Sequence, residues 1–66
     1  MSEYVENRVR EFRTKAEMTQ DELARRVGVS RQTVIAIEKG NYTPSVLLAL
    51  KLAATFNTSV EDLFKL

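Results

Sequence analysis

The chain has 66 residues, of which 44% are hydrophobic and 29% charged, with a net charge of +1 and neither cysteine nor histidine. A chain of this length buries only about 60% of its unfolded surface, and without Cys or His it lacks disulfides and the usual zinc ligands to support its small core. Two glycines and one proline are too few for a disordered chain or a many-turned β fold, so we expect one all-α domain over residues 1–66.

The first helix is expected over residues 5–15. Its apolar residues recur at the spacing of a single stripe along an amphipathic helix, and Arg and Glu occupy the opposite face. The stripe consists of Val5, Val9, Phe12 and Ala16.

The second helix is expected over residues 20–27. Thr19 and Glu22 have the spacing of a capping box, in which each side chain accepts a hydrogen bond from a free backbone N–H at the helix start. Gly28 should end the helix, because glycine adopts the left-handed backbone conformation without a Cβ clash.

The third helix is expected over residues 31–39, with Ser30 as its N-cap and Gly40 as its stop. Only a short turn separates it from the second helix. Two helices that cross at such a turn must approach closely, which requires small residues. Ala24 and Gly28 meet this requirement, so residues 20–39 are predicted to form a helix-turn-helix.

Two further helices are expected over residues 44–56 and 60–65. Thr43 is the expected cap of the fourth helix, and Pro44 suits the first helical position, where its missing N–H costs nothing. Ser59 caps the short fifth helix.

The fourth helix carries more apolar residues than one inward stripe needs. We assign to that stripe Val46, Ala49, Leu50, Ala53 and Phe56. The surplus residues are Leu47, Leu48 and Leu52. More apolar residues follow near the C-terminus, and they need a cover. A core that wraps all of them is one solution, but we favour a homodimer, whose expected interface consists of Leu47, Val60, Leu63, Phe64 and Leu66.

Charge is unevenly distributed along the chain. Residues 8–39 contain eight Lys or Arg against five Asp or Glu, so this segment has a net charge of +3. The rest of the chain has a net charge of −2. Such an excess of positive charge is compatible with solvated helix faces as well as with nucleic-acid binding. The positions of the charged residues must therefore decide between the two.

Several motifs together resemble one known family, the helix-turn-helix family of the phage lambda repressor and Cro proteins, also called the XRE family. The motifs are Thr19-Gln20-x-Glu22-Leu23-Ala24, Gly28-Val29-Ser30-Arg31-Gln32-Thr33-Val34, Ile37-Glu38-Lys39-Gly40, Thr43-Pro44-Ser45 and Val60-Glu61-Asp62-Leu63-Phe64. The resemblance covers nearly the whole chain. It implies a five-helix, lambda-repressor-like domain whose third helix lies in the DNA major groove.

The outward face of the third helix suits base reading. Arg can hold guanine O6 and N7, Gln can hold adenine N6 and N7, and small apolar groups can touch the thymine methyl group. By residue type and by the resemblance, the expected base readers are Arg31, Gln32, Thr33, Ile35 and Ala36.

Other residues should contact the DNA backbone or hold the fold. Residues at the start of the second helix and after the third helix are expected to bind phosphate, namely Gln20, Lys39, Asn41 and Tyr42. The resemblance implies a partly buried salt bridge between Arg13 and Glu38, which we interpret as structural. Arg8 and Arg10 receive no assignment.

Catalysis has little support. The usual general base, thiol nucleophile and metal ligands are missing, and no glycine-rich loop follows a strand, so we expect neither an enzyme nor a cofactor or metal site. No stretch approaches the roughly 18 apolar residues of a membrane span, and no signal peptide or effector-binding domain is visible. We expect a cytoplasmic protein whose partner is a double-stranded DNA operator.

Three functions remain open at this point. The first is a stand-alone transcriptional regulator, more commonly a repressor, that binds a palindromic operator. The second is an antitoxin that also binds a toxin protein. The third is an interaction module that has lost DNA binding. We favour the first, because Gln20, Arg31 and Gln32 occupy the positions expected to face DNA and no extra toxin-binding segment is visible.

Overall fold

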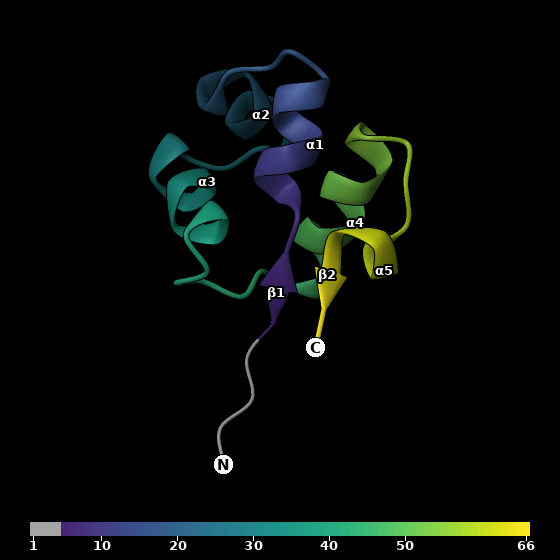
Figure 1. Cartoon of the computed structure of the whole chain (residues 1–66). Coiled ribbons are helices and arrows are strands. Elements are labelled where there is room, and N and C mark those ends of the chain that lie inside the picture. The colour runs from purple at the N-terminus through teal and green to yellow at the C-terminus, as the bar shows by residue number, and fades with distance from the viewer. Residues whose placement is uncertain (1–4) are drawn as a thin grey trace.

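The computed structural model describes residues 5–66, which form five helices and one two-stranded sheet (Figure 1). In chain order the elements are β1 (Glu6–Asn7), α1 (Val9–Lys15), α2 (Gln20–Val27), α3 (Arg31–Glu38), α4 (Val46–Thr55), α5 (Val60–Leu63) and β2 (Phe64–Lys65). The expected helix-rich fold is confirmed. None of the helices in this part of the chain is long and apolar enough to cross a membrane.

The second helix begins and ends where the sequence predicts. The Thr19 hydroxyl accepts from the backbone N–H of Glu22 at 3.0 Å, and the Glu22 carboxylate accepts from the backbone N–H of Thr19 at 2.9 Å. This second bond lowers the pKa of Glu22, because it favours the ionised form. The capping box is therefore intact at neutral pH and weakens only as the pH falls through that lowered pKa. Gly28 ends the helix in the left-handed conformation, with φ of 74°.

The two ends of the described chain form a strand pair that the sequence analysis missed. β1 pairs antiparallel with β2, with Glu6 opposite Lys65 and Asn7 opposite Phe64, and Figure 1 shows the two strands side by side. The Arg8 N–H also donates to the carbonyl oxygen of Leu63 at 2.8 Å. The first and fifth helices are therefore shorter than the predicted 5–15 and 60–65, because these backbone groups bond across the chain instead of along a helix.

The fourth helix begins later and faces differently from the prediction. Its N-cap is Ser45, whose hydroxyl accepts from the backbone N–H of Leu48 at 3.1 Å, so the helix starts at Val46 rather than at Pro44. It ends at Thr55 rather than at residue 56.

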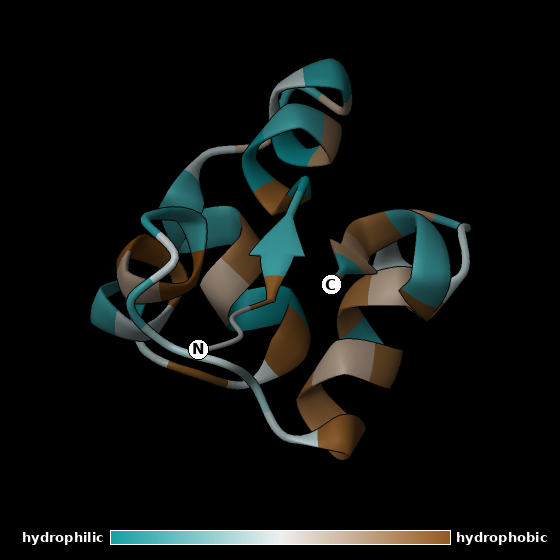
Figure 2. Cartoon of the chain, turned by 60° about the horizontal axis from the view of Figure 1, so that its bottom comes forward, coloured by the Kyte–Doolittle hydropathy of each residue, from teal (hydrophilic) through white to brown (hydrophobic). Residues whose placement is uncertain are grey.

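The inward stripe assigned to the fourth helix is wrong at several positions. Its buried residues are Leu48, Ala49, Leu52 and Ala53, whereas Val46 is 77% and Leu50 55% exposed. Nearly every position of this helix is apolar, so two rows spaced by four residues compete equally well for the core, and periodicity cannot choose between them. Brown and tan, the hydrophobic side of the colour scale, cover most of this helix in Figure 2.

One hydrophobic core joins all five helices. Among the described residues its buried members are Val9, Leu23, Ala24, Val27, Val34, Ile37, Leu48, Leu52, Ala53 and Leu63. Leu63 is completely buried there, so it belongs to the core and offers no surface to a second copy. α2 and α3 share this core through Leu23, Val34 and Ile37, which leaves the opposite face of α3 turned outward.

Truncation of a buried leucine of α4 should cost far more stability than truncation of an exposed one. We expect Leu52→Ala to lower the free energy of unfolding by about 2–5 kcal/mol, because the change removes buried apolar atoms and leaves a cavity. Leu50→Ala, the matched control, should cost less than about 1 kcal/mol. Urea-induced unfolding measures both stability costs. A repeat at a second protein concentration shows whether self-association contributes to either of them. Equal costs that are independent of concentration would contradict the orientation of α4.

Candidate nucleic-acid interface

The turn between α2 and α3 sets the position of α3. Gly28 takes the left-handed conformation, and Ala24 is buried beneath the turn, where only a small side chain lets the helices approach. Ser30 then caps α3, because its hydroxyl accepts from the backbone N–H of Thr33 at 3.2 Å. α3 therefore starts at Arg31, as the sequence predicts, with its first turn at the surface.

The first turn of α3 presents two long polar side chains to solvent. Arg31 and Gln32 are exposed, and Arg31 has no ion-pair partner among residues 5–66. The Thr33 hydroxyl lies 3.1 Å from that of Ser30, so it takes part in the cap. Ile35 and Ala36 are half-buried one turn further along. All five predicted base readers thus lie on or beside one surface, with the hydrogen-bond donors concentrated at its N-terminal end.

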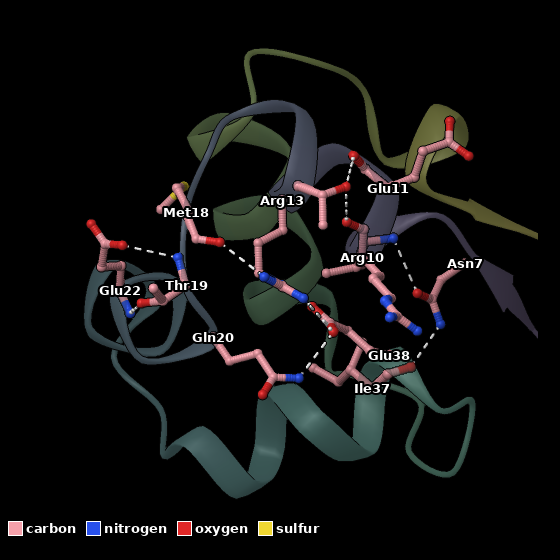
Figure 3. Close-up of polar contacts among 12 residues, drawn as sticks. Asn7, Arg10, Glu11, Arg13, Met18, Thr19, Gln20, Glu22, Ile37 and Glu38 are labelled. Atoms are coloured by element: carbon pink, nitrogen blue, oxygen red, sulfur yellow. Dashed lines mark hydrogen bonds and ion pairs between the residues drawn. The ribbon is translucent and has the colours of Figure 1, made fainter.

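The predicted salt bridge between α1 and α3 is present and is nearly buried. Arg13 Nε donates to Glu38 Oε2 at 2.6 Å and Arg13 Nη2 to Glu38 Oε1 at 3.2 Å, a bidentate pair (Figure 3). The side chains are only 13% and 4% exposed. Arg13 Nη1 also donates to the carbonyl oxygen of Met18 at 2.8 Å. One guanidinium group therefore connects α1, the loop before α2 and the last turn of α3.

Gln20 belongs to the same network. Its Nε2 donates to Glu38 Oε1 at 3.1 Å, which links the first residue of α2 to the last residue of α3 (Figure 3). This bond uses one of the two amide N–H groups of the side chain. The other N–H, together with the backbone N–H groups that have no acceptor within the first turn of a helix, remains available to an anion.

The segment after α3 is exposed. Lys39 is the C-cap, and Gly40 has a left-handed φ of 80° that turns the chain away from the helix axis. The Asn41 N–H donates to the carbonyl oxygen of Ala36 at 2.9 Å, which closes the end of the helix. The side chains of Lys39, Asn41 and Tyr42 remain at the surface.

Asn7 is a positioning residue that the sequence analysis did not identify. Its Nδ2 donates to the carbonyl oxygen of Ile37 at 2.8 Å, and its Oδ1 accepts from the backbone N–H of Val9 at 3.1 Å. The side chain thus joins the start of α1 to the last turn of α3, as Figure 3 shows. A polar residue two places before a helix was a usable signal for the second bond, but the contact with Ile37, thirty residues away, was not readable from the sequence.

The residues expected at a dimer interface fall into three groups. Leu47 is 64% and Leu66 87% exposed. Val60 and Phe64 are half-buried and help to line an apolar hollow of about 160 Å³, together with Val5, Thr43, Pro44, Val46 and Ala49. Leu63 lies in the core. The structure therefore brings Val60 and Phe64 together and places them beside exposed residues of α4.

The sequence matches a family model described as Helix-turn-helix over residues 9–63. An uncharacterised HTH-type transcriptional regulator from Archaeoglobus fulgidus is 56% identical over 57 residues, which cover 86% of this chain and 80% of the relative. A transcriptional repressor, RstR of a cryptic phage CTXphi of Vibrio cholerae, is 30% identical over 57 residues, which cover 86% of this chain and 51% of the repressor.

A solved structure supports the same fold. The restriction-modification controller protein C.AhdI from Aeromonas hydrophila superimposes with a TM-score of 0.77 at 33% sequence identity, and the match covers 83% of each chain. The match of the family model includes α1 to α5, so it contains the turn, the outward face of α3 and the ion pair described above.

Removal of Arg13 should leave the Glu38 carboxylate buried without its cation. We expect Arg13→Met to lower the free energy of unfolding by about 3–5 kcal/mol. The double variant Arg13→Met/Glu38→Leu should regain much of this loss, because it buries no unpaired charge. Urea unfolding of the wild type, both single variants and the double variant gives the coupling energy. Strictly additive losses would show that the two side chains do not stabilise the fold as a pair.

Proposed function

Since this chain belongs to the helix-turn-helix family of DNA-binding transcriptional regulators, we propose that it represses transcription by binding a palindromic DNA operator as a homodimer. α3 lies in the major groove in this proposal, and Gln20 holds the backbone beside it. The family and the relatives are transcriptional regulators and not enzymes. Because the operator is part of the genome, we also propose that the protein acts in the cytoplasm.

The observation that carries the proposal is the pair of free donors at the start of α3. The guanidinium of Arg31 suits guanine O6 and N7, and the amide of Gln32 suits adenine N6 and N7. Neither side chain is engaged by another of the described residues. Beyond them the surface becomes apolar at Ile35 and Ala36, which suits contact with thymine methyl groups. The Thr33 methyl group adds to this apolar part.

Phosphate contacts on both sides of α3 would fix its register on the duplex. Gln20 stands at the N-terminus of α2, where the helix dipole and free N–H groups favour an anion. Lys39, Asn41 and Tyr42 follow α3 and stand at the other end of the reading surface. These contacts orient the protein and do not distinguish one sequence from another.

A homodimer accounts for the apolar surface that the monomer leaves exposed. A two-fold interface uses the same face of both copies, so a projection and a matching hollow must lie on one face. Val46 and Leu50 project from α4, and the hollow lined by Val60 and Phe64 lies beside them. We therefore propose an interface of Val46, Leu47, Leu50, Val60, Phe64 and Leu66. Two copies joined in this way would present two reading helices to successive turns of the duplex.

The assignment as a repressor rests on the relative from Vibrio cholerae, which is a transcriptional repressor. A protein bound in the major groove at a promoter can exclude the transcription machinery by its presence alone. This mechanism requires only the DNA-binding domain.

Selection of binding sites from random duplex DNA tests the proposal. The purified protein should enrich an inverted repeat whose half-sites lie about 34 Å apart along the helix axis, one turn of the duplex. The selection should be made at near-physiological salt, because low salt raises non-specific affinity through counterion release. A single enriched half-site would refute the dimer alone, and a pool without enrichment would favour a protein-interaction module.

Substitutions should separate base reading from backbone contact. Arg31→Ala and Gln32→Ala should each cost about 1–3 kcal/mol on the selected operator and much less on unrelated DNA. Gln20→Ala should weaken binding to both DNAs alike. Binding titrations with the two duplexes measure the ratio, and circular dichroism checks that each variant is folded. Equal losses from all three substitutions on both duplexes would contradict the assignment of Arg31 and Gln32 as readers.

A further inference from the structure

Arg10, a cation from outside the helix-turn-helix, lies beside α3. Arg10, on α1, lines a hollow of about 350 Å³ at the surface between α1, the start of α2 and the end of α3. The other lining residues are Arg13, Gln20, Ile35, Glu38 and Lys39. Figure 3 shows the Arg10 side chain reaching from α1 towards the last turn of α3. α1 therefore contributes to the same side of α3 that Gln20 occupies.

The hollow carries positive charge that its own residues do not neutralise. Its one acidic residue is Glu38, whose carboxylate accepts from Arg13 and from Gln20. Within residues 5–66, neither Arg10 nor Lys39 has an ion-pair partner. The guanidinium group of Arg10, the ammonium group of Lys39 and the second amide N–H of Gln20 are thus free to face a bound anion.

A second hollow continues the first along α3. It has a volume of about 450 Å³ and is lined by Arg13, Met18, Thr19, Gln20, Asp21 and Arg31. Because Arg13 and Gln20 line both, the two hollows follow one another past the start of α2, between Arg31 at one end of α3 and Lys39 at the other. We call the two hollows together the trough, which runs beside α3. The sugar-phosphate strand next to a helix bound in the major groove would pass along this side of α3.

We propose that Arg10 binds a phosphate of the same DNA strand that Gln20 contacts, with Lys39 completing the site. The guanidinium group of Arg10 can hold two phosphate oxygens through parallel N–H bonds, whereas Lys39 adds a point charge. The inference rests on the proposed function, because it requires α3 in the major groove. It extends the DNA-binding surface from the helix-turn-helix to α1 and gives a role to a residue that the sequence left unassigned.

The salt dependence of binding tests this site, with Arg8 as a matched control. Arg8 precedes α1, pairs with Glu11 and lies with its guanidinium carbon 5.5 Å from the centre of the Phe12 ring, so it does not line the trough. Arg10→Gln and Arg8→Gln remove the same charge. For each protomer, Arg10→Gln should reduce the slope of log Kobs against log salt concentration by about 0.9, the loss of one phosphate contact. Arg8→Gln should leave the slope unchanged.

Three further measurements sharpen the test. Arg10→Lys should keep the wild-type slope, since a cation remains in the hollow. A series of operators with single neutral methylphosphonate linkages should contain one linkage that weakens binding of the wild type more than it weakens binding of Arg10→Gln. Circular dichroism should show that each variant is folded, because both arginines are exposed.

The outcomes distinguish this inference from the proposed function. If wild-type binding is specific and salt-dependent but Arg10→Gln and Arg8→Gln change the slope equally, Arg10 contributes only to the general field and the inference is wrong. If every methylphosphonate position affects the wild type and Arg10→Gln alike, it is also wrong. If the wild type binds no DNA at any salt concentration, the proposed function fails and the phosphate site fails with it.

Discussion

The bidentate pair between Arg13 and Glu38 is the interaction on which the geometry of the surface proposed to face DNA depends. Glu38 is the last residue of α3, and its nearly buried carboxylate is held by Arg13 from α1 and by Gln20 from the start of α2. A buried carboxylate tolerates few arrangements of its donors, because each unsatisfied oxygen would cost free energy. The pair therefore fixes the angle of α3 relative to two other helices, which apolar packing alone would leave less defined.

Asn7 makes a second restraint on the same helix turn. Its bond to the carbonyl oxygen of Ile37 lies one residue before Glu38, and Asn7 also belongs to β1, which pairs with β2 at the other end of the described chain. The last turn of α3 is thus held on one side by an ion pair and on another by the strand pair. In a small domain with a thin core, such polar connections between distant segments supply the orientation that a larger core would provide through packing.

Sequence reasoning predicted the parts of this structure that depend on local chemistry. Thr19, Glu22, Gly28 and Ser30 act through backbone groups within four residues, so the bounds of α2 and the start of α3 could be read directly. The strand pair could not, because Glu6 and Lys65 are distant in sequence and each strand has only two residues.

The orientation of α4 failed for a related reason. Its apolar residues outnumber the positions that face the core, and only contact with Leu63 and the other helices selects the buried row.

The candidate site likewise combines features that local sequence predicts with features that depend on distant contacts. The capping residues and the exposed donors of α3 are local features, whereas the use of Gln20 is not, since its amide both orients Glu38 and remains able to donate to an anion. A phosphate bound there would sit against the same network that sets the angle of α3, so the proposed backbone contact and the placement of the proposed base readers would depend on one set of hydrogen bonds.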